Sequence, residues 1–230
     1  MKKFTLLELL IVIAIIGILL TLLMPSLGKA RYQGRKAVCA SNIRQSGNGL
    51  LLSVKNNDGK FPDVQNHHQN APYTTRVAYW TNTGKWYNLG KTYKEGYMSS
   101  GEAFYCPQNE INGLTKFSFP YNSDANGDLK IHSGDYYVRV SYHLFPNYMT
   151  TTKRRSLLLS KIESDDLIMS ELMTSKTAVA HKEYGVGWNI MKSDFSVKFK
   201  KSDTAYSIIQ SGSLDWDWNG FGKVKDELVK

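Results

Sequence analysis

A continuous apolar run near the N-terminus constrains this chain more than any other feature. Residues 4–24 read FTLLELLIVIAIIGILLTLLM, and Glu8 is the only charged residue among them. A helix of about 20 residues spans the roughly 30 Å hydrocarbon core of a bilayer. A core helix of a soluble protein carries an amphipathic stripe, whereas this run is apolar on every side. The run therefore predicts a transmembrane helix over residues 4–25.

A cleaved secretory signal peptide is the alternative interpretation of this run. A signal peptide would have an apolar region of about 7–15 residues, followed by a cleavage site with small residues. Here the apolar run is longer, and Met24-Pro25-Ser26-Leu27-Gly28 follows it. A membrane anchor is therefore the favoured interpretation.

Glu8 is the unusual residue of the segment. A charged side chain at the centre of a bilayer costs roughly 2.5–3.5 kcal/mol, and less near the interface. Glu8 either lies shallow enough to reach water and has no further role, or it pairs with a positive charge from another subunit. The residues alone leave both interpretations open.

Residues 4–19 resemble the class III signal of type IV prepilins and type II secretion pseudopilins. In that family a peptidase cleaves just before the Phe and methylates the new N-terminus. The resemblance implies a leader peptide of residues 1–3, cleavage between Lys3 and Phe4, and N-methylation of Phe4. It also implies that Glu8 pairs with the terminal amine of a neighbouring subunit, and that the helix bends at Pro25, which lacks a backbone N–H. Lys3 departs from the family, in which Gly usually precedes the cleavage site.

The resemblance also implies partners and a location. The expected partners are identical or related pilin subunits, the prepilin peptidase, the inner-membrane assembly platform and the lipid bilayer. Lys2 and Lys3 favour a cytoplasmic N-terminus, whereas the four basic residues between Lys29 and Lys36 favour the opposite orientation. The family places the head outside the cytoplasm of a bacterium. The chain would cross the cytoplasmic (inner) membrane once, and the filament would lie in the periplasm or at the cell surface.

The charge of the chain is consistent with a membrane surface. The formal net charge is +9, and the basic residues are scattered except for the cluster at 29–36 beside the apolar run. That position favours anionic lipid headgroups as the partner. No nucleic-acid recognition motif accompanies the charge, so nucleic acid is not an expected partner.

After Pro25 the apolar residues recur at helical spacing, which predicts an amphipathic stalk helix over residues 26–55. We expect this helix to be loosened at Pro25 and at Gly47-Asn48-Gly49, and to end at residues 56–59, where Asn56-Asn57-Asp58-Gly59 forms a stop signal. Its apolar stripe is expected to pack on the head.

Residues 56–230 are expected to form one globular head domain. Short segments rich in β-branched and aromatic residues predict strands over 136–142, 167–171, 187–191 and 196–200. The predicted fold class is α+β, with the long helix packed on an antiparallel sheet, as the family also implies. Short matches at residues 39–45, 56–62, 105–107 and 181–199 resemble a bacterial branch of pilin-like proteins with large heads.

The chain contains two cysteines, Cys39 and Cys106. Cysteines pair in exported domains and stay reduced in the cytosol. With the exported head that the resemblance implies, we expect a disulfide that ties the head to the stalk. Two buried free thiols are the alternative.

A partial calcium motif lies near the C-terminus. Residues 215–220 read DWDWNG, the start of a D-x-D-x-N-G loop. The oxygen ligands would come from Asp215, Asp217, Asn219 and Asp226, the last at the closing position, where such loops prefer Glu. An aromatic surface turn is the simpler interpretation, and we expect no required cofactor, with Ca²⁺ as a possible ligand.

The other polar residues give no enzyme signature. No phosphate-binding loop, nucleophile elbow or zinc-ligand spacing is present, so an enzyme is not expected. His181 is a candidate partner for Asp194 in a structural hydrogen bond. Four tryptophans are candidates either for sugar stacking or for core packing: Trp80, Trp86, Trp216 and Trp218.

The expected function is a structural subunit of a type IV pilus or a type II secretion pseudopilus. The subunit would be anchored in the membrane before assembly and would polymerise through its N-terminal helix. The alternative is a singly anchored surface protein that does not polymerise and carries a glycan-binding head.

Overall fold

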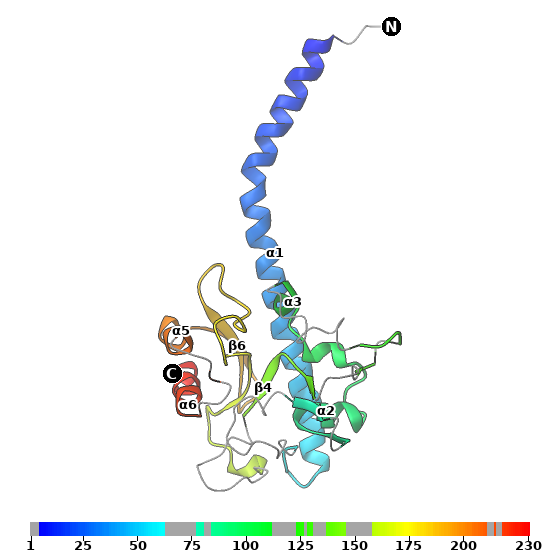
Figure 1. The fold of residues 1–230 in the computed structure, drawn as a ribbon, viewed down its shortest axis with the longest axis vertical. Coiled ribbons are helices and arrows are strands. Elements are labelled where there is room, and N and C mark those ends of the chain that lie inside the picture. The colour runs from blue at the N-terminus through cyan, green and yellow to red at the C-terminus, as the bar shows by residue number, and fades with distance from the viewer. Residues whose placement is uncertain are drawn as a thin grey trace. The chain divides into compact units, whose positions relative to one another are not determined.

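A single long helix begins the chain, and the strands follow it, so the protein is α+β (Figure 1). The computed structural model describes residues 5–62, 77–80, 84–111, 123–126, 128–130, 137–145, 158–210, 214 and 218–230. These residues fall into two units, Met1–Arg35 and Lys36–Lys230. The helix α1 (Leu6–Asn56) contributes its first part to one unit and its second part to the other.

In the first unit, the α1 side chains from residue 6 to residue 31 are exposed on all sides. Pro25 lies inside the helix, which continues through it. The predicted end of α1 is confirmed, because Asp58 and Gly59 adopt φ values of 53° and 75° just after it. Positive φ terminates right-handed helices and is most easily adopted by Gly. The bend at Pro25 stays a prediction.

In the second unit, α1 buries one face in the head. Cys39, Ile43, Leu50 and Val54 are fully buried along this face. The amphipathic stalk predicted over residues 26–55 therefore has its buried face in this unit, from residue 36 onward, whereas its residues 26–31 are exposed. The predicted loosening at Gly47 and Gly49 is wrong, since the helix is continuous there.

The two glycines have a packing role instead. A Cβ at Gly47 would lie 2.1 Å from Met191 Cε, and one at Gly49 would lie 2.4 Å from Met98 Sδ. Those distances are far below a normal van der Waals contact. The missing side chains therefore let the head approach the α1 backbone closely.

A small antiparallel sheet has the strand order β2-β1-β3, with β1 (Val77–Trp80), β2 (Lys85–Trp86) and β3 (Tyr137–Arg139). After β2 the chain forms α2 (Asn88–Lys94), a 3₁₀ turn η2 (Gly101–Phe104) and α3 (Pro107–Ile111). Gly90 of α2 sits against the Ala78 carbonyl of β1, where a Cβ would lie 2.2 Å from the oxygen.

The larger antiparallel sheet has the order β4-β5-β6-β7. Its strands are β4 (Tyr142–Leu144), β5 (Leu167–Glu171), β6 (Gly187–Lys192) and β7 (Val197–Lys201). The predicted strands at 167–171, 187–191 and 196–200 are confirmed to within one residue. The single strand predicted at 136–142 is wrong, because the chain leaves the small sheet after β3 and enters the large sheet at β4.

Beyond β7 the chain forms two helices, α5 (Asp203–Gln210) and α6 (Trp218–Val229), which lie beside β6 (Figure 1). A short 3₁₀ turn, η4 (Leu159–Lys161), precedes β5. The helices and the sheet share a second core, which includes Phe145, Trp188, Ile209, Phe221, Val224 and Leu228. The first core packs the second half of α1 against strands of both sheets.

Candidate functional site

The first turn of α1 holds Glu8 in a capping box. The Glu8 Oε2 atom accepts hydrogen bonds from the Thr5 backbone N–H and the Thr5 hydroxyl, both at 2.8 Å. The Glu8 N–H donates in return to Thr5 Oγ1 at 3.2 Å. Reciprocal bonds in a T-x-x-E sequence satisfy the orphan donors of a helix N-terminus. The sequence Thr5-Leu6-Leu7-Glu8 carries this signal, and our sequence analysis missed it.

The first part of α1 has an apolar surface that no other described residue of its unit covers. Leu6, Ile18 and Leu22 are 83%, 62% and 70% exposed. Among the described helices, α1 is long and apolar enough to cross a membrane. Lys3 and Phe4, the residues of the predicted cleavage site, lie outside the described residues.

The second half of α1 is attached to the head by the Cys39–Cys106 disulfide, which confirms the predicted bond. Both cysteines are fully buried, and they are separated by 67 residues in the sequence. Closing a loop of this size stabilises a fold by roughly 2–5 kcal/mol in the chain-entropy account. The disulfide therefore links α1 to the segment that precedes α3.

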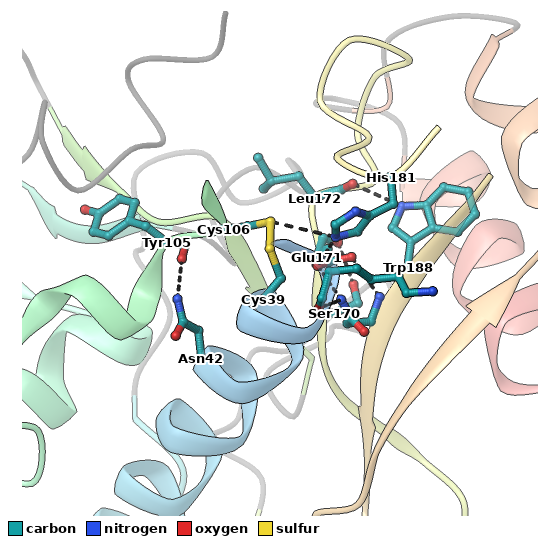
Figure 2. A network of polar contacts seen from close by, with 11 residues as sticks. Cys39, Asn42, Tyr105, Cys106, Ser170, Glu171, Leu172, His181 and Trp188 are labelled. Carbon is teal, nitrogen blue, oxygen red and sulfur yellow. Dashed lines mark hydrogen bonds and ion pairs between the residues drawn. A yellow bond between two sulfur atoms is a disulfide. The ribbon is translucent and has the colours of Figure 1, made fainter. Parts of the chain in front are cut away.

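Polar side chains on the same part of α1 reinforce that link. Asn42 Nδ2 donates to the Tyr105 carbonyl at 2.7 Å, and Ser46 Oγ donates to the Ala103 carbonyl at 2.9 Å. Buried carbonyls need such donors, because leaving one unpaired costs free energy comparable to a lost hydrogen bond. Figure 2 shows the Asn42 contact beside the disulfide.

A buried polar network lies on the other side of the disulfide (Figure 2). Glu171 Oε1 lies 3.0 Å from His181 Nε2 and accepts a hydrogen bond from Asn189 Nδ2 at 2.8 Å. Glu171 Oε2 accepts from the Asn189 N–H at 2.7 Å. His181 Nε2 is also 3.9 Å from Cys106 Sγ. The three polar side chains are almost completely buried, so this carboxylate depends on its hydrogen-bond donors.

The register of the large sheet explains how the network forms. Ser170 of β5 pairs with Ile190 of β6, so Glu171 and Asn189 are each one residue beyond that pair. His181 is held next to them by an antiparallel bridge to Gly187 at the start of β6. The predicted pairing of His181 with Asp194 is wrong, since Asp194 lies in the exposed turn between β6 and β7.

The network also reaches α1. Asn189 Nδ2 donates to the Lys36 carbonyl at 3.3 Å, and Lys36 Nζ lies 4.2 Å from the centre of the Phe199 ring. A cation above an aromatic face is attracted to it. Strands β6 and β7 therefore hold the start of the packed part of α1, while the disulfide holds it one turn further on.

Only two of the four residues of the calcium motif lie in the described structure. Asn219 and Asp226 both lie in α6, seven residues and therefore about 10 Å apart along one helix. A calcium loop would instead turn its fifth and twelfth residues toward one ion. Asp215 and Asp217 lie outside the described residues, so calcium binding there stays a prediction.

The tryptophan candidates give a similar partial result. Trp86 is half-buried, and its ring centre lies 4.8 Å from that of Tyr79 and 5.8 Å from that of Tyr93. Trp86 thus packs in an aromatic cluster. Trp216 and the side chains of Trp80 and Trp218 lie outside the described residues.

Two structural sites result from this geometry: a capped apolar helix, and a buried junction that fixes its second half to the head. The junction contains sulfur, imidazole and carboxylate, but these groups are buried and the two sulfurs are bonded to each other. In this state the junction is suited to mechanical linkage. Comparison with protein-family models, curated proteins and solved structures gave no match to this chain.

Proposed function

We propose that this chain is a structural subunit of a type IV pilus or a type II secretion pseudopilus. The exposed apolar surface of α1 between residues 6 and 27 is the observation that carries the proposal. Burying apolar surface is favourable by about 25 cal/mol per Å². Lipid of the bacterial inner membrane would cover this surface before assembly, and the helices of neighbouring subunits would cover it in the filament.

The junction supports the same proposal. A filament subunit must transmit force from its helix to its head without unfolding. The Cys39–Cys106 disulfide links the two covalently, and the Asn189–Lys36 hydrogen bond adds a contact three residues earlier on α1. A flexible linker would instead leave the head free to change its position on the helix.

The capping box suggests how Glu8 serves both the single subunit and the filament. Both Thr5 donors bind Oε2 of Glu8. Among the described residues these bonds leave Oε1 able to accept a further hydrogen bond. We propose that Oε1 receives the N-terminal ammonium of a neighbouring subunit. A charge-assisted hydrogen bond of this kind is strongest where water is excluded.

Two matched substitutions test this role. Glu8→Gln keeps an oxygen acceptor for Thr5 but removes the charge, so it should abolish filaments in the sheared fraction while the chain stays in the membrane. Thr5→Ala removes the cap, at a cost of about 0.5–2 kcal/mol of helix stability, but keeps the carboxylate and should leave filament yield largely intact.

The remaining outcomes separate the alternatives. Loss of filaments in Thr5→Ala together with wild-type yield in Glu8→Gln would mean that Glu8 acts only as a helix cap. Wild-type protein that stays in the membrane, forms no filaments and behaves like Glu8→Gln would favour the anchored, non-polymerising surface protein. Filament yield is measured by immunoblot of sheared and membrane fractions at matched expression.

A further inference from the structure

Four side chains with metal-binding atoms converge at the junction between α1 and the head. The atoms are the two sulfurs of Cys39 and Cys106, a Glu171 carboxylate oxygen and a His181 ring nitrogen, and all lie within 4.8 Å of one another. All four residues are fully buried. They come from α1, the segment before α3, the end of β5 and the connection to β6, so their spacing in the sequence gives no metal motif.

The distances are close to those of a tetrahedral zinc site. Zinc bonds of about 2.3 Å to sulfur and about 2.0 Å to nitrogen or oxygen place neighbouring ligand atoms roughly 3.3–3.8 Å apart. His181 Nε2 is 3.9 Å from Cys106 Sγ and 3.0 Å from Glu171 Oε1. Small side-chain shifts would make these separations tetrahedral. The larger change is the separation of the two sulfurs, which requires that the disulfide be absent.

We propose that the chain with its cysteines reduced binds one Zn²⁺ through Cys39, Cys106, Glu171 and His181. The disulfide and the metal are then alternative links between α1 and the head. A chain that has not yet been oxidised already carries both thiols, so it needs no reductant. On binding, the two thiols release two protons and bind as thiolates. His181 binds through Nε2 with its proton on Nδ1, and Glu171 contributes Oε1.

The surrounding residues suit such a site. Asn189 donates from its backbone N–H to Glu171 Oε2 at 2.7 Å and from Nδ2 to Oε1 at 2.8 Å. Hydrogen bonds of this kind orient a ligating carboxylate and tune its affinity for the metal. Two thiolates and an imidazole select zinc over calcium or magnesium, which prefer ligand sets made of oxygen.

The test uses the full chain in detergent micelles and Co²⁺ as the probe, because cobalt–thiolate bonds absorb light. A phosphine first reduces the disulfide to two thiols; the phosphine becomes its oxide, with oxygen and protons supplied by water. The reduced chain should bind one Co²⁺ with thiolate-to-metal charge-transfer absorption, and Zn²⁺ should displace it. The oxidised chain should show no such absorption. Absence of the band in the reduced wild type, or an equal band in the oxidised protein, would overturn the proposal.

Substitutions identify the two ligands that are not sulfur. Glu171→Gln and His181→Gln should each weaken Co²⁺ binding by on the order of tenfold or more. Glu183→Gln, at an exposed position near His181, is the matched control and should bind as the wild type does. If either ligand variant fails to fold, X-ray absorption of the zinc-loaded wild type decides the question. Two sulfur and two nitrogen or oxygen neighbours with imidazole scattering would support the site, and any other shell would overturn it.

Discussion

Hydrogen-bond donors hold two carboxylates in this chain: Glu8, in the first turn of α1, and Glu171, which is fully buried. Glu8 receives its donors from Thr5, in the same helical turn, so that arrangement is local and survives in a single subunit. Glu171 receives its donors from Asn189 and His181, on other segments, so its network depends on the folded head. The Glu8 contacts therefore depend only on the first turn of α1, whereas the Glu171 network can change only if the junction opens.

Asp194 provides a prediction about pH. The Ser196 hydroxyl and the Ser196 backbone N–H, the latter 2.8 Å from Asp194 Oδ1, hold the pKa of Asp194 below its ordinary value. A carboxyl whose folded pKa is lowered stabilises the fold above its unfolded pKa of about 3.9, and that contribution is lost as pH falls through the folded pKa. Asp194→Asn should therefore flatten the acid side of the stability curve. Urea unfolding between about pH 5 and pH 2 measures this, with Glu183→Gln as the exposed control.

At the scale of elements, we expect replacement of glycine by alanine to have opposite effects on stability at two positions of α1. Gly47→Ala places a Cβ against the fully buried Met191 side chain and should destabilise the head by roughly 1–3 kcal/mol, which exceeds the gain in helix propensity. Gly34→Ala meets nothing within 4 Å and should stabilise the helix by about 0.5–1 kcal/mol. Denaturant unfolding, followed by fluorescence of the buried Trp188, measures the head. Equal effects at both positions would mean that Gly47 is not a packing glycine.

The elements that could be predicted from the sequence are those with an unbroken local signal. The strands β5, β6 and β7 are bounded by turn residues, and their predicted limits agree with the structure to within one residue. The segment 136–142 was predicted as one strand, but it contains β3 and the start of β4, which belong to different sheets. Residue alternation does not show which sheet a strand enters. The helix α6 has an amphipathic pattern, with Phe221, Val224 and Leu228 on one face. The sequence analysis did not predict this helix, because it interpreted the overlapping residues 215–226 as a calcium motif.

The junction itself could not be predicted from the sequence. Its disulfide followed from two cysteines in a domain expected outside the cytoplasm, which needs no geometry. The Glu171–Asn189 contact requires the β5–β6 register, which residue patterns leave undetermined. The sequence analysis named Asp194 as the candidate partner of His181, although Glu171 is nearer in the chain, 10 residues away. The actual partner, Glu171, faces His181 because β5 and the start of β6 lie side by side.

At the scale of the whole molecule, the proposed function makes one prediction about the mature chain. Mass spectrometry of the N-terminal peptide from native membranes or sheared filaments should find N-methyl-Phe4 as the first residue. Cleavage there removes Lys2 and Lys3 and leaves one ammonium directly before Thr5, where it can reach Glu8 of a neighbouring subunit. In the single subunit Thr5 already binds Glu8, but both of its hydrogen bonds go to Oε2. The ammonium can therefore bind Oε1 without displacing Thr5.

Lys3→Gly supplies the comparison for that measurement, because it restores the residue that usually precedes the cleavage site in the family. If Lys3 slows the peptidase, the variant should raise the fraction of chains that begin at Phe4, and filament yield should rise with it. If the wild type is fully processed, the two should agree. A wild-type chain that retains Met1 while Lys3→Gly is cleaved and forms filaments would show that the helix is competent to assemble and that Lys3 prevents it. An uncleaved chain in both cases would contradict the filament proposal and leave α1 as a permanent anchor for the head.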